Sequence, residues 1–426
     1  MRACSLCSTI TFMCKVICVT DLKLCENKYE QLKRLVNSGI DTLILRAKEL
    51  SEDGYRALAK EVTELAEHSD TEVVLHSFYK TAIELGAKKI HLPLPVLREL
   101  DGSIKQQFEV IGASVHSVDE AKEAVSLGAA CLTVGHIFDT DCKKGLKGRG
   151  TAFLREVCES VDVPVYAIGG ISPDNVWRVK RAGADGVCLM SAFMTDSQPD
   201  RLAGRLKDKL SARITAEQLR LYAITDNRYF RDRGMVECVE AALKGGANII
   251  QLRDKGVSHE KLVHEAKLLR EVCGRYEAPL IVNDDWRAAL EAGADGVHVG
   301  IEDESVAEIR KHVPEGFIIG ATAKTVEQAQ TAQAQGADYL GVGAVFPSPT
   351  KPDAIHIDKA QFARIKQSVR IPCVAIGGIT KANLPTLSDL GADGFALVSA
   401  VFGAEDIETE TKELAAFCRC CWGKPF

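Results

Sequence analysis

Apolar and polar positions alternate along the chain in two kinds of segment. Short runs rich in Val, Ile, Leu and Ala precede longer stretches with apolar residues at helical spacing, and these end in small-residue turns such as AGAD or LGAD. This order is typical of repeated βα units around a parallel sheet. In the second half it predicts eight strands, at 221–224, 249–252, 280–282, 296–299, 318–321, 339–342, 374–376 and 394–398.

The two halves of the chain repeat one another. VICVTD at 16–21 matches LYAITD at 221–226, an offset of 205 residues, and VPVYAIGGIS at 163–172 matches IPCVAIGGIT at 371–380, an offset of 208. Such a period indicates a duplicated domain. We therefore predict an α/β fold of two tandem (β/α)8 TIM barrels, 1–210 and 211–426, joined near 208–218. The alternative, a doubly wound sheet, lacks its glycine-rich turn after the first strand.

Composition and charge narrow the classes of function. The 426 residues are 46% hydrophobic and 26% charged with a net charge of -6, which disfavours a nucleic-acid partner. No apolar window reaches the ~18 residues of a membrane span, and the first fifteen residues make a poor signal peptide. The fifteen cysteines follow no recurring spacing, so we expect reduced thiols in a cytoplasmic protein. The oligomeric state stays open, and a homo-oligomer is compatible with the sequence.

Polar residues follow the predicted strands of the second half, where barrel enzymes carry their chemistry. Gln251, Arg253 and Lys255 alternate after the second strand and suit a polyanion. Asp284 and Asp303 follow the next two strands, and two carboxylates beside cations predict a Mg²⁺ ion shared with substrate phosphate oxygens. Asp285 better suits a helix cap.

Two further segments of the second half predict anion binding. The loop GAVFPSPTKPDA offers Ser348, Thr350 and Lys351, which can grip an anionic ligand over the barrel mouth. Gly377 and Gly378 end the seventh strand, and loops after strands seven and eight commonly form a phosphate site with Ser399 nearby. A metal-assisted diphosphate site beside a monophosphate site predicts group transfer with release of pyrophosphate.

QLRDKG, VNDDW, GVHVGIED, GAVFPSPTKPD and AIGGIT together resemble thiamine phosphate synthases over nearly the whole second half. That family joins a hydroxymethylpyrimidine diphosphate to a thiazole phosphate. The resemblance implies Asp284 and Asp303 as Mg²⁺ ligands and Lys351 as the cation that assists departure of the diphosphate. It implies substrate contacts from Gln251, Arg253, Lys255, Asn283, Thr322, Ser348, Thr350, Gly378 and Ser399. Ile301 departs from the family, which usually has Gln there.

The first half has lost the acidic residues. Alignment of the repeat places Ile44 opposite Gln251, His76 opposite Asn283 and Ser77 opposite Asp284, and Asp303 falls opposite the apolar run HLPLPVL. Without these carboxylates the half should not hold Mg²⁺-diphosphate. What remains predicts one phosphorylated ligand and metal-free chemistry, with binding residues Arg46, Lys48, Gly169, Gly170 and Ser191.

New histidines suggest proton transfer in the first half, since imidazole titrates near neutral pH. SVHSVDEA, GHIFDTDCKKGLKGRG and AIGGISPDN resemble the TenI-like thiazole tautomerases, which shift a proton in a thiazole carboxylate phosphate. The resemblance implies His116 as the acid/base residue. We interpret His91 as structural, because His298 occupies the same place in the second half, and we do not expect Cys142 to be a nucleophile.

The predicted protein is therefore a fused enzyme of thiamine biosynthesis with small phosphorylated pyrimidine and thiazole substrates. Two alternatives remain at this point. The first half could be a degenerate barrel that binds a ligand or supports the fold. The second half could be another phosphate-using barrel enzyme, such as an isomerase.

Overall fold

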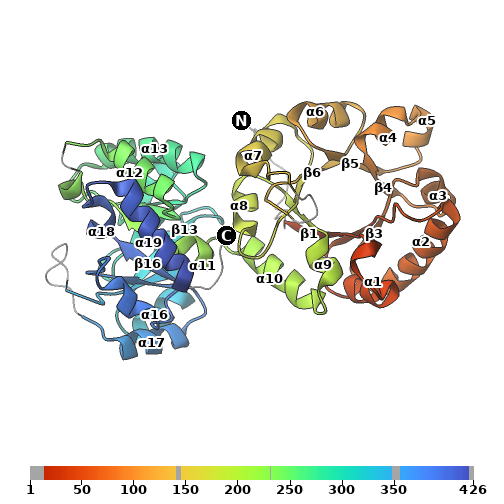
Figure 1. Ribbon diagram of the computed structural model, residues 1–426. Coiled ribbons are helices and arrows are strands. Elements are labelled where there is room, and N and C mark those ends of the chain that lie inside the picture. The colour runs from red at the N-terminus through yellow and green to blue at the C-terminus, as the bar shows by residue number, and fades with distance from the viewer. Residues whose placement is uncertain (1–13, 141–144, 231, 348–355, 422–426) are drawn as a thin grey trace. The chain divides into compact units, whose positions relative to one another are not determined.

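The computed structural model describes residues 14–140, 145–230, 232–347 and 356–421. The chain divides into two compact units, Met1–Ala212 and Arg213–Phe426. Each unit contains a closed barrel of eight parallel strands, which Figure 1 shows for the N-terminal unit surrounded by its helices. The predicted fold of two tandem TIM barrels is confirmed.

The N-terminal barrel closes in sequence order, because β8 pairs with β1. Its strands are β1 Lys15–Val19, β2 Thr42–Leu45, β3 Glu72–His76, β4 Lys89–Pro93, β5 Val110–Val115, β6 Cys131–Gly135, β7 Val165–Ile168 and β8 Gly186–Leu189. The helices are α1 Lys28–Val36, α2 Glu52–Ala66, α3 Tyr79–Glu84, α4 Leu94–Glu99, α5 Gly102–Lys105, α6 Val118–Ser126, α7 Gly150–Ser160, α8 Val176–Arg181, α9 Ser191–Thr195 and α10 Pro199–Ser211. A 3-10 turn, η1, spans Leu22–Leu24.

The C-terminal barrel repeats this order and closes through β16 and β9. Its strands are β9 Leu221–Ile224, β10 Ile249–Leu252, β11 Leu280–Asn283, β12 Gly296–Val299, β13 Ile318–Ala323, β14 Tyr339–Gly343, β15 Cys373–Ile376 and β16 Gly394–Leu397. Its helices are α11 Ala216–Leu219, α12 Met235–Gly245, α13 His259–Arg275, α14 Trp286–Glu291, α15 Val306–Arg310, α16 Val326–Ala334, α17 Lys359–Ser368, α18 Ser399–Phe402 and α19 Ile407–Cys421, with 3-10 turns η3 Asn227–Tyr229 and η4 Leu384–Leu387.

The aspartates of the GAD turns hold the barrels together at the amino ends of the strands. Each one accepts a hydrogen bond from the first residue of the preceding strand, or from the residue beside it, at 2.7–2.8 Å. The pairs are Asp185 with Val165, Asp295 with Leu280, Asp338 with Ile319 and Asp393 with Cys373. The repeated turn therefore satisfies a strand N–H that the parallel ladder leaves without a partner.

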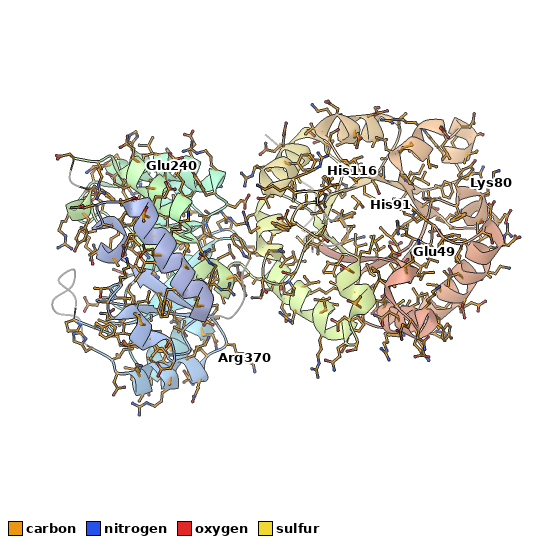
Figure 2. All side chains as sticks on the ribbon, in the orientation of Figure 1. Glu49, Lys80, His91, His116, Glu240 and Arg370 are labelled. Carbon is orange, nitrogen blue, oxygen red and sulfur yellow. The ribbon has the colours of Figure 1, made fainter. Side chains whose placement is uncertain are left out.

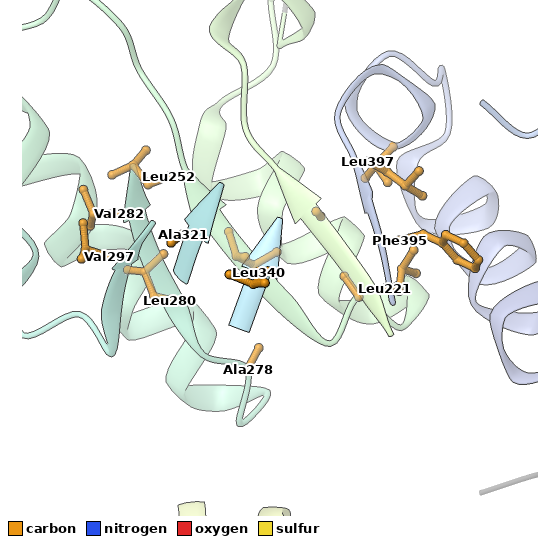
Figure 3. Packing of buried hydrophobic residues seen from close by; sticks show 14 of the residues in the cluster. Leu221, Leu252, Ala278, Leu280, Val282, Val297, Ala321, Leu340, Phe395 and Leu397 are labelled. Atoms are coloured by element: carbon orange, nitrogen blue, oxygen red, sulfur yellow. The ribbon is translucent and has the colours of Figure 1, made fainter. Parts of the chain in front are cut away.

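Apolar side chains of the strands fall into two sets because successive residues face opposite sides. One set packs outward against the helices, as Figure 3 shows for Leu252, Val282, Val297 and Leu397. The other set fills the barrel interior, with Tyr222, Ile224, Ile249, Ile281, Ile318, Tyr339, Val374 and Ala396 in the C-terminal barrel. The interior of the N-terminal barrel carries Ile17, Val19, Ile44, Val74 and Cys188. Most of the predicted site residues of the described ranges lie at or just beyond the carboxyl ends of the strands.

Two sequence expectations concern features other than the site. Within the part of the chain that the structure describes, no helix combines the length and apolar character of a membrane span. Among the described residues, eleven cysteines between Cys14 and Cys420 form no disulfide, and most of them are buried.

Candidate active site

A continuous chain of hydrogen bonds crosses the interior of the C-terminal barrel. The Gln251 amide donates to the Tyr222 hydroxyl at 2.9 Å, and this hydroxyl meets that of Tyr339 at 2.7 Å. Tyr339 lies 3.1 Å from Nδ1 of His298, whose Nε2 lies 3.1 Å from the Thr322 hydroxyl. Burial lowers the pKa of His298 to about 4, so its imidazole is neutral. The structure thus joins two predicted substrate contacts, Gln251 and Thr322, through residues that were not predicted.

Glycines make room for this chain. A Cβ on Gly320 would lie 2.1 Å from the Tyr339 ring, and one on Gly341 would lie 3.0 Å from the His298 ring. Both aromatic side chains therefore fit only because the neighbouring strands carry glycine at these points.

The predicted cations lie beside the end of β10. Arg253 forms an ion pair of 3.5 Å with Asp226, which also binds Arg228 at 2.7 Å. The Arg253 N–H donates to the Thr225 hydroxyl at 2.8 Å, which fixes the backbone at the start of the loop. Lys255 is exposed two residues further on. The charges of Lys255 and Arg253 oppose the larger effects of burial and Asp303 on the pKa of Asp284, so the two cations lie near that carboxyl group.

Asp284 and Asp303 lie within hydrogen-bonding reach of one another. Burial and the neighbouring Asp303 raise the pKa of Asp284 to about 6. Asp284 has φ +67°, a left-handed conformation rare outside glycine, and its N–H donates to the His298 carbonyl at 2.9 Å. Asp303 accepts from the Gly300 N–H at 2.6 Å, and Ile301 between them is 47% exposed.

Two crowded carboxylates that repel one another suit a divalent cation placed between them. No group of three or more His, Cys, Asp or Glu side chains with metal-binding geometry occurs in the described ranges. Mg²⁺ commonly uses one or two protein carboxylates and takes its other ligands from water and substrate phosphate, so Asp284 and Asp303 could hold this ion. Asp285 instead caps α14, because its carboxylate accepts from the Ala288 N–H at 2.8 Å.

The turn Gly377–Gly378 after β15 has a left-handed backbone conformation that favours glycine, and it contacts the loop that follows β14. Gly377 and Gly378 have φ of +101° and +61°, and a Cβ on Gly378 would lie 2.2 Å from the Pro347 carbonyl. Asn383, which was not predicted, donates to the Gly378 carbonyl at 2.9 Å and accepts from the Thr380 N–H. Ser399 begins α18 and lines a separate pocket of about 420 Å³. Without a side chain at these two positions, an anion could approach the backbone N–H groups of the turn closely.

One cavity of about 490 Å³ occupies the mouth of the N-terminal barrel. Every residue predicted for this half lines it, namely Arg46, Lys48, His116, Gly169, Gly170 and Ser191. The GG turn is built as in the other barrel, because Asn175 donates to the Gly170 carbonyl at 2.9 Å. The cations that follow β2 and the glycines that follow β7 are far apart in the sequence and therefore meet at one opening.

Two buried histidines form a wall of this cavity. The rings of His76 and His91 stack with centroids 5.7 Å apart. Burial lowers the pKa of His91 to about 4. Burial also lowers the pKa of His76, to about 3, with smaller effects from His91, Arg46 and Lys48. His91 Nε2 lies 2.9 Å from the Ser114 hydroxyl. In the other barrel, His298 Nε2 lies 3.1 Å from the Thr322 hydroxyl, so the two halves share this contact.

One ring nitrogen of His116 is hydrogen-bonded to the backbone, and no hydrogen bond engages the other among the described residues. Its Nδ1 lies 3.0 Å from the carbonyl oxygen of Gly135, and since a carbonyl only accepts, the proton lies on Nδ1. Nε2 then carries the lone pair. Glu120 accepts from the His116 backbone N–H, as Gln328 does from Lys324 at 2.9 Å in the other barrel. Figure 2 shows His91 and His116 inside the ring of helices.

Some predicted residues lie outside the described ranges. These are Ser348, Thr350 and Lys351 of the long loop after β14, together with Cys142 in the first half. Asn283, the remaining predicted contact, is the last residue of β11, next to Asp284.

Comparison with known proteins places both barrels in one family. The family model described as thiamine monophosphate synthase matches residues 16–193 and 221–401. The chain belongs to this family. The resemblance inferred from the sequence is thereby confirmed for both halves.

Individual family members match over the length of one barrel. A thiamine-phosphate synthase of Clostridium tetani is 40% identical over 197 residues, which are 46% of this chain and 94% of that protein. One of Pyrococcus furiosus is 44% identical over 197 residues, 46% of this chain and 93% of that protein. A solved structure of thiamine phosphate pyrophosphorylase from P. furiosus is 40% identical, covers 49% of this chain and 99% of its own, and has a TM-score of 0.46.

Proposed function

We propose that the C-terminal barrel is a Mg²⁺-dependent thiamine phosphate synthase. It couples hydroxymethylpyrimidine diphosphate with thiazole phosphate, or its carboxylate, and releases pyrophosphate. The observation that carries this proposal is that Asp284 lies beside Asp303 and near both Lys255 and Arg253 at the carboxyl ends of the strands. Relatives named thiamine-phosphate synthase, at 40–44% identity over one barrel, support it.

Each group of residues has a role in this reaction. When bound, Mg²⁺ on Asp284 and Asp303 would supply positive charge to the departing diphosphate. Arg253 and Lys255 hold the same oxygens, and the amide of Gln251, oriented by Tyr222, positions the pyrimidine ring. The bond from the pyrimidine methylene to the diphosphate oxygen breaks first, and the thiazole nitrogen then donates its lone pair to the resonance-stabilised cation. The Gly377–Gly378 turn holds the phosphate of the thiazole.

Pyrophosphate release by the full chain tests this assignment. With both substrates present, we expect release that requires Mg²⁺, and Asp284→Asn should reduce it at least about 100-fold because the departing charge loses its counter-ion. Asp285→Asn is the matched control, since it makes the same change at the neighbouring helix-capping residue, where Asn can also cap, and should keep the Mg²⁺ requirement. Release that persists in Asp284→Asn without Mg²⁺ would instead indicate another phosphate-using barrel enzyme.

For the N-terminal barrel we propose thiazole tautomerase activity. The observation behind it is His116, which lines the cavity with Gly169 and Gly170 and has Nε2 free to exchange a proton. Nε2 takes a proton from one position of the thiazole carboxylate phosphate and returns it at another, so the reaction is an isomerisation without net loss of atoms. The two proposed reactions are consecutive steps of thiamine biosynthesis.

Loss of the less stable tautomer, followed by ultraviolet absorption, tests this second assignment. His116→Gln should slow it about 100-fold or more, within the range expected of a general acid/base group. His68→Gln changes an exposed histidine of the same barrel outside the cavity and should have no effect. Unchanged tautomerisation in His116→Gln would show that this barrel binds a ligand or serves the fold.

A further inference from the structure

The cavity of the N-terminal barrel keeps the cations of a diphosphate site and has lost its carboxylates. Arg46 and Lys48 line it at the positions of Arg253 and Lys255. Ser77 replaces Asp284 with the same backbone conformation, φ +67°. Both cations therefore stayed while the metal carboxylates were lost, and this raises the question of which anion the cations bind.

The cations at this end of the cavity suit a ligand with a single negative charge, because carboxylates already neutralise two of them. Arg46 forms an ion pair of 3.4 Å with Asp21, and Arg98 on the same wall binds Glu123 through two hydrogen bonds of 2.7 Å. Lys48 has no carboxylate partner within the described ranges. Partial burial and the neighbouring Arg46 lower the pKa of Lys48, so this ammonium is close to a second cation and gains from a bound anion.

The negative charge of a diphosphate is too large for the positive charge that remains at this end of the cavity. A diphosphate carries about three negative charges and usually shares them with Mg²⁺, whereas a ring carboxylate carries one. Ile44 and His76 also replace Gln251 and Asn283 of the other barrel, so the polar groups around the cations have become an apolar side chain and a neutral imidazole. The surroundings suit a small anion attached to an aromatic ring.

The position of the cations agrees with a ligand that is anionic at both ends. Lys48 follows β2, and Gly169 follows β7, which lies three strands away around the closed ring through β1 and β8. Opposite strands of an eight-stranded ring are four apart, so the two sites lie nearly across the mouth from one another. His76 and His91 on β3 and β4 and His116 after β5 occupy the third side.

We propose that Arg46 and Lys48 form a carboxylate-binding subsite, which distinguishes a thiazole phosphate that carries a ring carboxylate from one that lacks it. The inference rests on the proposed function for the phosphate and the ring, and it adds the group that selects the substrate. With its phosphate on the Gly169–Gly170 turn and its carboxylate at Lys48, the ring lies beside His116.

Ligand selectivity of the full chain tests the subsite. Calorimetry would measure the affinity for thiazole phosphate with and without the carboxylate, in wild type and in Lys48→Met, which removes the charge and keeps the chain length. Loss of a charged hydrogen bond predicts about tenfold weaker binding of the carboxylated ligand. The ligand without carboxylate should change by less than about twofold, within the spread of ordinary surface substitutions.

Two further variants complete the experiment. Lys48→Arg keeps the charge and should retain most of the selectivity. Lys255→Met makes the same change in the other barrel and should leave the selectivity of the N-terminal site unaltered. This control shows which of the two barrels is responsible for the selectivity. Equal weakening of both ligands by Lys48→Met, or no weakening of either, would overturn the inference.

The outcome is separable from that of the proposed function. If wild type binds the carboxylated ligand selectively through Lys48 but does not tautomerise it, the subsite stands and the tautomerase assignment fails. If wild type tautomerises the ligand and Lys48→Met binds both ligands as wild type does, the activity stands and the subsite is wrong.

Discussion

At the scale of single residues, the barrel interiors show how one scaffold accepts different polar groups. Tyr222, Tyr339 and Gln251 of the C-terminal barrel correspond to Ile17, Cys131 and Ile44 of the N-terminal barrel. The interior chain of hydrogen bonds exists only where both tyrosines and the amide occur together. A buried hydroxyl without its partner costs free energy, so these three positions must change as a group.

Tyr339→Phe tests whether this chain positions substrate. The change leaves the Tyr222 hydroxyl and His298 Nδ1 without a shared partner, and Gln251 loses its orientation. We expect KM for the pyrimidine diphosphate to rise about tenfold, which corresponds to one or two net hydrogen bonds. Tyr276→Phe is the matched control, because its hydroxyl binds Glu240 near the surface. An unchanged KM in Tyr339→Phe would assign the chain to stability alone.

His91 makes the stability of the N-terminal barrel dependent on pH. Burial lowers its pKa to about 4, while an unfolded chain has a histidine pKa near ~6.5. Between these values the unfolded state binds a proton that the folded state does not, so the free energy of unfolding falls as pH falls, by up to about 3 kcal/mol. His91→Gln should remove this loss between pH 6.5 and 4, measured by urea unfolding. An equal acid loss in both proteins would contradict the assignment to His91.

At the scale of elements, strand ends and glycine turns decide the shape of the site. The apolar runs predict the strands of the second half to within a residue or two, for example 394–398 against Gly394–Leu397. Buried parallel strands read directly as apolar segments, which explains this success. The pairing of Tyr222 with Tyr339 was not predictable in this way, because 117 residues separate them and only closure of the barrel brings them together.

Gly378→Ala tests the turn after β15 against a turn of similar conformation. Gly378 and Gly391 both have positive φ, +61° and +71°, but only at Gly378 would a Cβ meet backbone, the Pro347 carbonyl at 2.2 Å. Gly391→Ala should cost about 1 kcal/mol of stability for the conformation alone. Gly378→Ala should lower the Tm further and raise KM for thiazole phosphate. If both variants lose the same stability and keep the same KM, the turn does not hold the phosphate.

At the scale of the whole molecule, duplication makes each barrel the reference for the other. The sequence repeat was sufficient to predict two barrels, the lost carboxylates of the first half and the cations and glycines that both halves retain. It did not predict Asn175 and Asn383, which brace the two glycine turns. Both asparagines stand five residues beyond the second glycine, in loops whose course depends on the turn itself, so spacing alone carries no signal for the contact.

Separate hydrophobic cores predict that ligands stabilise one barrel at a time. Each unit has its own core of strand and helix side chains. Mg²⁺ with pyrophosphate at about 100 times the dissociation constant should stabilise the C-terminal unit by about 2.7 kcal/mol, which raises its Tm by about 5–11 °C. Scanning calorimetry of the full chain should therefore show one transition that moves and one that does not.

Asp284→Asn assigns the moving transition. In this variant the shift with Mg²⁺ and pyrophosphate should disappear, because the carboxylate that faces Asp303 is gone, while the other transition stays at its wild-type temperature. Thiazole carboxylate phosphate should move the transition that Asp284→Asn leaves unaffected, through the cavity that contains Lys48. A shift that survives in Asp284→Asn would place the metal elsewhere, and two transitions that always move together would mean that the duplicated barrels unfold as a single unit despite their separate cores.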